Sequence, residues 1–240
     1  RWRINGTPMS RRDFCTIVEQ LKSAYDRFLT NYPSEWVTYH EVLTLIGFMY
    51  FAQKNVAYAV LEVGMGGDLD ATNIIPHKDA AIITTVGADH LELLGPTLSD
   101  VARHKAGIIT MPTTVITGVS DPEHRAIIAA RVEATGSTCP DSSFDYTVLK
   151  KTAETTVFVY QNTTYLLQVF GEHQIKNAIL AIRTAECLAL PLKAIKHGLR
   201  LARFPLRFEC LQRAPWCIAD GAHNPEKFSA TVNALTDVKN

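Results

Sequence analysis

The stretch that decides the fold is Val60-Leu61-Glu62-Val63-Gly64-Met65-Gly66-Gly67-Asp68-Leu69-Asp70-Ala71-Thr72-Asn73. It ends an apolar run that begins at Val56, and glycines and small polar residues follow it. A buried parallel strand is such a run, and open α/β sheets place their ligands just beyond the carboxyl ends of their strands. We therefore expect a strand over Val56–Val63, with Glu62 where the core ends and a binding site begins. The alternative is a strand end followed by a glycine-rich turn that has no binding or catalytic role.

A second apolar run, Ala80–Val86, ends in the same way, and Asp89 and His90 follow it closely. If the two strands are parallel neighbours, Glu62 and His90 emerge at the same edge of the sheet. One carboxylate and one imidazole, completed by water and phosphate oxygens, suit Mg²⁺ or Mn²⁺. A lone histidine at a strand end is more often a hydrogen-bonded structural residue. The prediction of a metal site therefore depends on Glu62 and His90 occurring together.

Helical and strand patterns alternate along the chain. Capping boxes at Ser10-Arg11-Arg12-Asp13, Thr38-Tyr39-His40-Glu41 and Thr97-Leu98-Ser99-Asp100 predict three helix starts. The first helix should end before Pro33, the second near Lys54 and the third at Gly107, in the usual C-terminal position of glycine. A strand over Thr114–Thr117 and a helix over Pro122–Ala134 complete the series. The alternation predicts an α/β fold with a mostly parallel sheet covered by helices.

The pattern changes between Phe144 and Phe170. Short alternating segments at Tyr146–Lys150, Thr156–Tyr160 and Tyr165–Phe170 predict an antiparallel meander at one edge of the sheet. Helices are expected again over Gln174–Leu190 and Leu192–Ala202. Phe204–Arg207 resembles a linker, and Trp216–Asp220 resembles the first strand of a second domain, with a helix starting at Pro225.

The composition is that of a soluble globular protein, with 47% apolar and 20% charged residues. Lys and Arg number 24, as do Asp and Glu, so no net field favours nucleic acid or an anionic membrane. No apolar stretch approaches the roughly 20 residues of a membrane span. The five cysteines form no C-x-x-C pair, which favours a reducing compartment, by default the cytoplasm.

Lys105 lies in Ala102-Arg103-His104-Lys105-Ala106-Gly107-Ile108, in the last turn of a predicted helix. A lysine there can simply complement the helix dipole. Near a metal it could instead pair with phosphate, or its neutral amine could be carbamylated and supply a carboxylate. The residues themselves leave these alternatives open.

Asp220-Gly221-Ala222-His223-Asn224-Pro225 follows a predicted strand and opens a predicted helix. Backbone N–H groups at a helix start are a natural seat for an anion. Asp220 could accept a ribose hydroxyl while His223 approaches phosphate, and Arg207 could reach a nucleotide phosphate from the linker. The alternative is an ordinary turn, because Asp-Gly is common in turns.

Taken together, the sequence resembles the folylpolyglutamate synthase/dihydrofolate synthase family of the Mur ligase superfamily, over essentially all 240 residues. The motifs that carry the resemblance, in the family's order, are Ile4–Ser10, Thr38–Glu41, Glu62–Asn73, Asp89-His90 with Leu94-Gly95, Lys105–Ile108, Gly171–Gln174 with Asn177, and Asp220–Pro225. The departures are Asp68 where arginine is usual, His40 where an aromatic is usual, Leu91 where threonine is common, and Leu206 where glycine is usual.

The resemblance implies an ATP-dependent amide ligase. A substrate carboxylate, on dihydropteroate, on folates or on both, would be phosphorylated to an acyl phosphate and attacked by the amino group of L-glutamate. The implied fold is a P-loop NTPase-like Mur ligase central domain over residues 1–203. A linker and the start of a Rossmann-like glutamate-ligase domain would occupy residues 204–240. A monomer is expected, with no nucleic acid or membrane partner.

The resemblance also implies a role for individual residues. Glu62 and His90 would be Mg²⁺ ligands in a site for two ions, with K⁺ as a further candidate cofactor. Lys105 would be the carbamylated lysine that supports the second metal and, with His90, the catalytic step. ATP would be contacted by Asn177, Arg207, Asp220 and His223. The pterin pocket would be lined by Thr38, Tyr39, His40, Glu41, Leu69, Asp70 and Ala71.

The family's phosphate-binding loop, G-x-x-G-K-[ST], belongs upstream of Ile4 and does not occur in the 240 residues. We therefore expect a fragment that lacks this loop and most of the C-terminal domain, and that is inactive as it stands. Two alternatives remain open. One is a non-catalytic pterin-binding relative, and the other is a Mur-type ligase that acts on cell-wall precursors.

Overall fold

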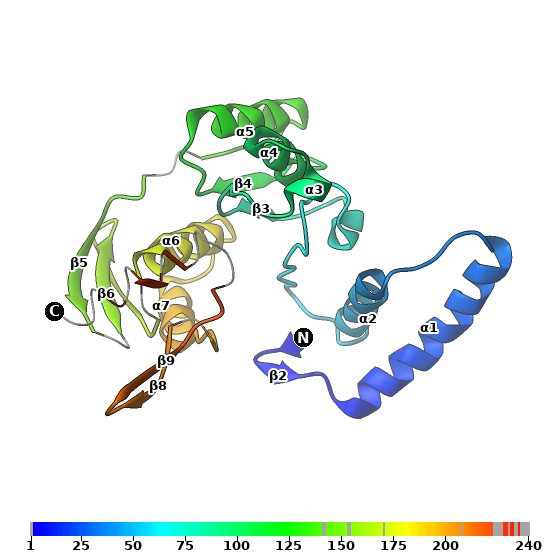
Figure 1. Ribbon diagram of the computed structural model, residues 1–240, viewed down its shortest axis with the longest axis horizontal. Coiled ribbons are helices and arrows are strands. Elements are labelled where there is room, and N and C mark those ends of the chain that lie inside the picture. Colours follow the sequence, from blue (N-terminus) through cyan, green and yellow to red (C-terminus); the bar gives the residue numbers. More distant parts are fainter. Residues whose placement is uncertain are drawn as a thin grey trace. The chain divides into compact units, whose positions relative to one another are not determined.

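The structure is a computed structural model that describes residues 2–140, 143–152, 155–169, 171–206, 208–222, 228–229, 231–232 and 235. The chain divides into two compact units, Arg1–Ile75 and Pro76–Asn240 (Figure 1). Two residues predicted to contact ATP, Arg207 and His223, lie outside the described residues. The boundary expected near residue 204 stays a prediction.

The first unit is built from a short hairpin and two helices. Strands β1 (Arg3–Ile4) and β2 (Thr7–Pro8) pair antiparallel, and helices α1 (Arg11–Asn31) and α2 (Tyr39–Gln53) follow. The predicted caps at Ser10 and Thr38 are confirmed, since each side chain accepts a hydrogen bond from the backbone N–H three residues on. Ile17, Ile46 and Tyr50 form the buried centre of this unit.

The strand expected over Val56–Val63 is not formed, and this prediction is wrong. Within the described ranges no strand pairs with this segment, and Val60 is 93% exposed. An apolar run becomes a strand only where a neighbouring strand supplies hydrogen-bond partners. The chain then continues through the glycine turn into η1 (Ala71–Ile74), a short 3₁₀ helix.

The second unit begins with a parallel pair of strands. Strand β3 (Ala80–Ile83) pairs with β4 (Thr114–Thr117), with Ile82 opposite Ile116, which confirms a parallel sheet. Helices α3 (Leu91–Leu94), α4 (Leu98–Ala106) and α5 (Pro122–Ala134) belong to this part, and α4 packs on α5. Helix α6 (Glu172–Cys187) contacts both strands from the side away from α4 and α5 (Figure 1).

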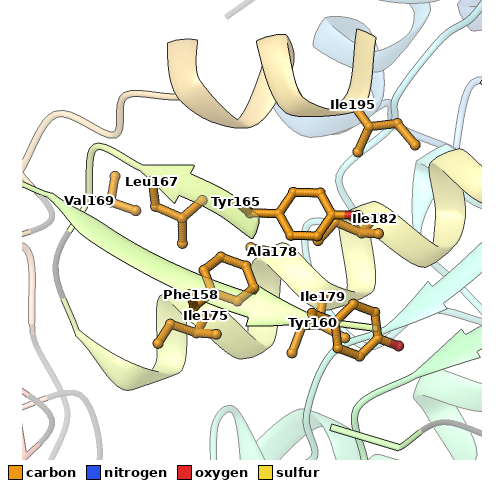
Figure 2. Close-up of a cluster of buried hydrophobic side chains, with 10 residues drawn as sticks. All are labelled: Phe158, Tyr160, Tyr165, Leu167, Val169, Ile175, Ala178, Ile179, Ile182 and Ile195. Carbon is orange, nitrogen blue, oxygen red and sulfur yellow. The ribbon is translucent and has the colours of Figure 1, made fainter. Parts of the chain in front are cut away.

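The predicted meander is confirmed as three antiparallel strands, β5 (Tyr146–Lys151), β6 (Thr156–Tyr160) and β7 (Thr163–Leu167). It forms a sheet of its own and does not join an edge of the β3–β4 pair, which corrects its expected position. Helices α6 and α7 (Leu192–Leu201) bury its apolar face. Figure 2 shows this core, which contains Phe158, Tyr160, Tyr165, Leu167, Val169, Ile175, Ala178, Ile179, Ile182 and Ile195.

The segment after α7 contains a hairpin. Strand β9 (Trp216–Ala219), close to the expected strand, pairs antiparallel with β8 (Glu209–Arg213), which the sequence reading did not predict. The helix expected from Pro225 begins outside the described residues. In the part of the chain that the structure describes, no helix has both the length and the apolar character needed to cross a bilayer.

Candidate ligand and metal site

The first candidate region is the pocket predicted at Thr38–Glu41 and Leu69–Ala71. Thr38 is the N-cap of α2: its hydroxyl and its backbone N–H both donate to Glu41 Oε2, each at 2.7 Å. The hydrogen bonds from Thr38 hold the pKa of Glu41 below its ordinary value of 4.5. The caps therefore fix the start of α2, while Tyr39 and Leu69 remain exposed and available to a ligand.

Asp70 organises the glycine turn. Its Oδ2 accepts hydrogen bonds from the backbone N–H groups of Gly64, at 2.9 Å, and Met65, at 3.1 Å. Its Oδ1 accepts from the backbone N–H of Thr72, at 2.9 Å, and from the Thr72 hydroxyl, at 2.6 Å. Burial raises the pKa of Asp70, but these hydrogen bonds outweigh it and hold the pKa below its ordinary value of 3.8.

His40 joins the two halves of this pocket. Its Nε2 lies 3.4 Å from Asp70 Oδ2, and the Asp70 side chain is only 3% exposed. A Cβ atom built on Gly64 would lie 2.8 Å from His40 Cε1 and Nε2, so any other residue at this position would require the ring to shift. The structure thus brings together His40 and the glycine turn, which lie far apart in the sequence.

Glu62 and His90, the predicted metal ligands, lie in different units. Glu62 is exposed in an irregular segment, so the two residues do not both follow strands of one sheet as predicted. Within the described residues no group of three or more His, Cys, Asp or Glu side chains could hold a metal ion. Glu62 and His90 stay predicted ligands, and as a carboxylate and an imidazole they fit a divalent cation that keeps several waters.

His90 has an unusual backbone. Its φ of 53° and ψ of 37° place it in the left-handed region, just before the four-residue helix α3. A non-glycine residue there costs roughly 1–3 kcal/mol and is often found at functional sites. The imidazole lies between two carboxylates, with Nε2 3.7 Å from Asp89 Oδ1 and Nδ1 3.6 Å from Glu92 Oε1.

Lys105 lies in the last turn of α4, which begins at the predicted capping box of Thr97 and Asp100. Burial lowers the pKa of Lys105 below its ordinary value of 10.5, and the charge of Asp89 opposes this effect. The amine is therefore easier to deprotonate than that of an exposed lysine. Gly107 follows with φ −61°, so it ends the helix without the left-handed conformation that glycine usually supplies.

The described nucleotide-binding candidates are Asn177 and Asp220. Asn177 is exposed on α6, where its Nδ2 donates to Gln174 Oε1 at 3.4 Å. Asp220 follows β9, and its Oδ2 accepts from the backbone N–H of Phe208 at 2.7 Å. Its Oδ1 accepts from the backbone N–H of Ala222 at 2.8 Å and from the Thr231 hydroxyl at 3.0 Å. Asp220 therefore orders the turn, and its predicted contact with ribose stays a prediction.

The structure also contains a cavity that the sequence does not predict. It has a volume of about 490 Å³, lies within the first unit and is mostly apolar. Its lining residues come from the end of α2 and from the segment that follows it: Phe48, Phe51, Ala52, Asn55, Val56, Ala59, Leu61 and Ile75. The sequence signal for this cavity is the apolar run over Val56–Val63, whose pattern predicts a strand instead.

The fold and the site define an α/β protein with a parallel strand pair, a strained histidine beyond one strand and a partly buried lysine. Residues 15–185 match the family model of the Mur ligase middle domain. The chain therefore belongs to the Mur ligase family.

Two curated relatives show where in this family the chain lies. It is 33% identical to folylpolyglutamate synthase of Lacticaseibacillus casei over 98% of the chain and 58% of the relative. It is also 33% identical to dihydrofolate synthase/folylpolyglutamate synthase of Bacillus subtilis, over 94% of the chain and 55% of the relative. The chain thus spans between half and two thirds of these relatives.

Solved structures agree with this placement. The apo form of the L. casei folylpolyglutamate synthase matches with a TM-score of 0.87 and 32% identity, over 98% of this chain and 60% of that one. The Mycobacterium tuberculosis enzyme complexed with ADP and AMPPCP matches with a TM-score of 0.88 and 29% identity, over 98% of this chain and 57% of that one. A complex of folylpolyglutamate synthase with AMPPCP and folate matches with a TM-score of 0.83 and 32% identity, over 93% of this chain and 58% of that one.

Proposed function

We propose that this chain is part of an ATP-dependent ligase that adds L-glutamate to dihydropteroate, to folates or to both. The observation that carries the proposal is the match of residues 15–185 to the Mur ligase middle domain. The two curated relatives have this activity in their names, and related structures hold ATP analogues and folate. In the reaction, ATP phosphorylates the substrate carboxylate, and the glutamate amine then displaces phosphate to form the amide.

Negative charge builds on the transferring phosphoryl group, so cationic groups supply most of the stabilisation. Two Mg²⁺ ions, with Glu62 and His90 among their ligands, would neutralise phosphate oxygens, and K⁺ remains a further candidate. Asn177, Arg207, Asp220 and His223 would hold ATP. The residues Thr38–Glu41 and Leu69–Ala71 would hold the pterin. We further propose a monomer in the cytoplasm, without nucleic-acid or membrane partners.

Binding measurements on the 240-residue chain test the substrate class. We expect dihydropteroate or folate to bind and a nucleotide-linked cell-wall peptide to fail to compete. Preference for the cell-wall peptide would support the Mur-type alternative, and binding of neither acceptor would overturn the proposal. Glutamate-dependent release of ADP should be absent, because the 240 residues contain no G-x-x-G-K-[ST] pattern. Detectable ADP release would contradict the expected inactivity while supporting a ligase.

We also propose that Lys105 is carbamylated. Its deprotonated Nζ would attack CO₂, an N–C bond would form, and the proton would pass to solvent. The lowered pKa of Lys105 supports this step because it enlarges the neutral fraction of the amine. In the presence of ¹³C-bicarbonate, a carbamate signal should appear in the carbon NMR spectrum of the wild-type chain and be absent from Lys105→Arg.

Lys78 offers a matched control for this experiment. Its pKa is also lowered by burial, but it donates to Thr110 Oγ1 at 3.0 Å in a different part of the unit. Lys78→Arg should therefore retain the carbamate signal. Loss of the signal in Lys78→Arg, or its persistence in Lys105→Arg, would assign the modification to another lysine.

A further inference from the structure

The linker segment, residues 204–208, and the turn that follows β9 meet at one carboxylate. Because β8 and β9 pair as a hairpin, the residues before β8 and after β9 lie side by side at its open end. The Gly221 N–H donates to the Leu206 carbonyl at 2.7 Å. The Phe208 N–H donates to Asp220 Oδ2, also at 2.7 Å. Two segments that carry predicted nucleotide contacts are thereby joined.

The linker segment is held in a strained conformation. Leu206 has a φ of 59° and Phe208 a φ of 50°, which bulky residues rarely adopt. Such strain persists only where the surrounding contacts over-determine the backbone. Here Glu209 Oε2 accepts the Leu206 N–H at 2.9 Å, and the Phe208 side chain is buried. The conformation of the linker segment is therefore set by its partners, and the carboxylate of Asp220 is one of them.

Thr231 connects a third segment to the same carboxylate. It is half-buried and helical, and its hydroxyl donates to Asp220 Oδ1 at 3.0 Å. The Ala222 N–H donates to the same oxygen at 2.8 Å. Donors on both oxygens oppose rotation of the Asp220 carboxylate, because rotation would break hydrogen bonds at Oδ1 and at Oδ2 together. Thr231 lies outside the motifs that carry the family resemblance.

We propose that Thr231 is a positioning residue for the nucleotide site: its hydroxyl fixes the orientation in which the Asp220 carboxylate meets a ribose hydroxyl. The ribose hydroxyl would donate a hydrogen bond to Asp220, and Thr231 itself would not touch the nucleotide. This inference rests on the proposed function in taking Asp220 as a nucleotide contact. It goes further in naming a second residue and in assigning its effect to the ribose rather than to the phosphates.

Calorimetric titration of the 240-residue chain with ADP, 2′-deoxy-ADP and 3′-deoxy-ADP tests the proposal. In the wild type, loss of the hydroxyl that meets Asp220 should weaken binding about three- to tenfold, as expected for one hydrogen bond. In Thr231→Val, ADP should bind about three- to tenfold more weakly than in the wild type, for the same reason. The affinity for that deoxy analogue should change little, so the preference for ADP should almost vanish.

Thr231→Ser keeps the hydroxyl, so it should retain the wild-type preference for ADP. Thr184→Val removes a hydroxyl that donates to the Leu180 carbonyl at 2.8 Å within α6, and it should bind all three nucleotides like the wild type. If Thr231→Val does not fold, Thr231→Ala replaces it. An unchanged preference for ADP in Thr231→Val would overturn the proposal. Equal weakening for ADP and both analogues would also overturn it, because the hydroxyl would then only support the fold.

The wild-type titrations separate this inference from the proposed function. If the wild type binds ADP and both deoxy analogues equally well, the role of Thr231 is overturned while nucleotide binding stands. If the wild type binds none of the three, the nucleotide contact assigned to Asp220 is itself contradicted. Hydrogen–deuterium exchange then decides the structural joint alone: residues 206–210 should exchange about two- to fivefold faster in Thr231→Val than in Thr231→Ser. Equal exchange in these two variants would overturn the joint as well.

Discussion

At the scale of the residue, Asp70 shows how one side chain orders a loop. Its carboxylate receives hydrogen bonds from Gly64, Met65 and Thr72, and it lies against His40. Asp70→Asn keeps the shape but replaces one acceptor oxygen by a donor and removes the charge. We expect the free energy of unfolding at pH 7 to fall by about 1–3 kcal/mol, the usual cost of an unsatisfied buried group. Urea denaturation measures the change.

The pH dependence of the same variant follows from the lowered pKa of Asp70. A carboxylate with a lowered pKa stabilises the fold at pH values above its ordinary pKa of 3.8. This contribution is lost as the pH falls through the lower pKa that the group has in the folded protein. Asp70→Asn should lack this loss on the acid side. Asp26→Asn, at an exposed position on α1, serves as the control. Equal urea midpoints and acid profiles in all three proteins would contradict the role assigned to Asp70.

At the scale of the element, the ends of β3 and β4 approach each other closely. The Gly118 N–H donates to the Ile83 carbonyl at 3.0 Å, and a Cβ on Gly118 would lie 2.5 Å from the Thr84 carbonyl oxygen. Backbone cannot move aside as a flexible side chain can. We expect Gly118→Ala to lower the free energy of unfolding by about 1–3 kcal/mol, in the range of other overpacked sites.

Gly198 provides the matched control for this prediction. It lies inside α7, and a Cβ there would meet nothing within 4 Å. Gly198→Ala should therefore raise the free energy of unfolding by up to about 1 kcal/mol, because alanine restricts the unfolded chain and favours helix. Thermal unfolding of the two variants should move in opposite directions. An unchanged or raised unfolding temperature in Gly118→Ala would show that the strand ends can separate without cost.

At the scale of the whole molecule, a hydrophobic core lies between the meander and helices α6 and α7 (Figure 2). Ile179 is fully buried in it, beside Phe158 and Ile175. We expect Ile179→Ala to cost about 2–5 kcal/mol of unfolding free energy and Ile179→Val about 0.5–1.5 kcal/mol. Chemical denaturation gives these values. A loss below about 1 kcal/mol in Ile179→Ala would mean that the core collapses around the cavity.

Much of the fold was accessible from local patterns. The starts of α1, α2 and α4 follow from capping residues, and the Pro122–Ala134 helix matches its prediction at both ends. Capping depends on hydrogen bonds within four residues, so the sequence contains all the information needed. The meander was equally accessible because its strands are short runs rich in β-branched and aromatic residues, such as Thr156–Tyr160, with polar residues between them.

Other features were not accessible in this way. The segment over Val56–Val63 has the composition of a buried strand, yet in the described residues no strand pairs with it. Conversely, β8 has a weak strand pattern and becomes a strand because β9 lies beside it. The roles of Glu62, His90, Lys105 and Asn177 rest on motif resemblance, and they stay predictions.

Local patterns in the sequence predict the positions of most helices, the alternation of an α/β protein and the set of motifs that indicate the Mur ligase family. These features depend on local hydrogen bonds and on side-chain periodicity. The folded chain alone shows that His40 lies against Asp70, that its ring approaches Gly64 closely, and that Lys105 is partly buried near Asp89. Those outcomes depend on partners distant in the chain, because burial and ion pairing are set by the folded surroundings of each group.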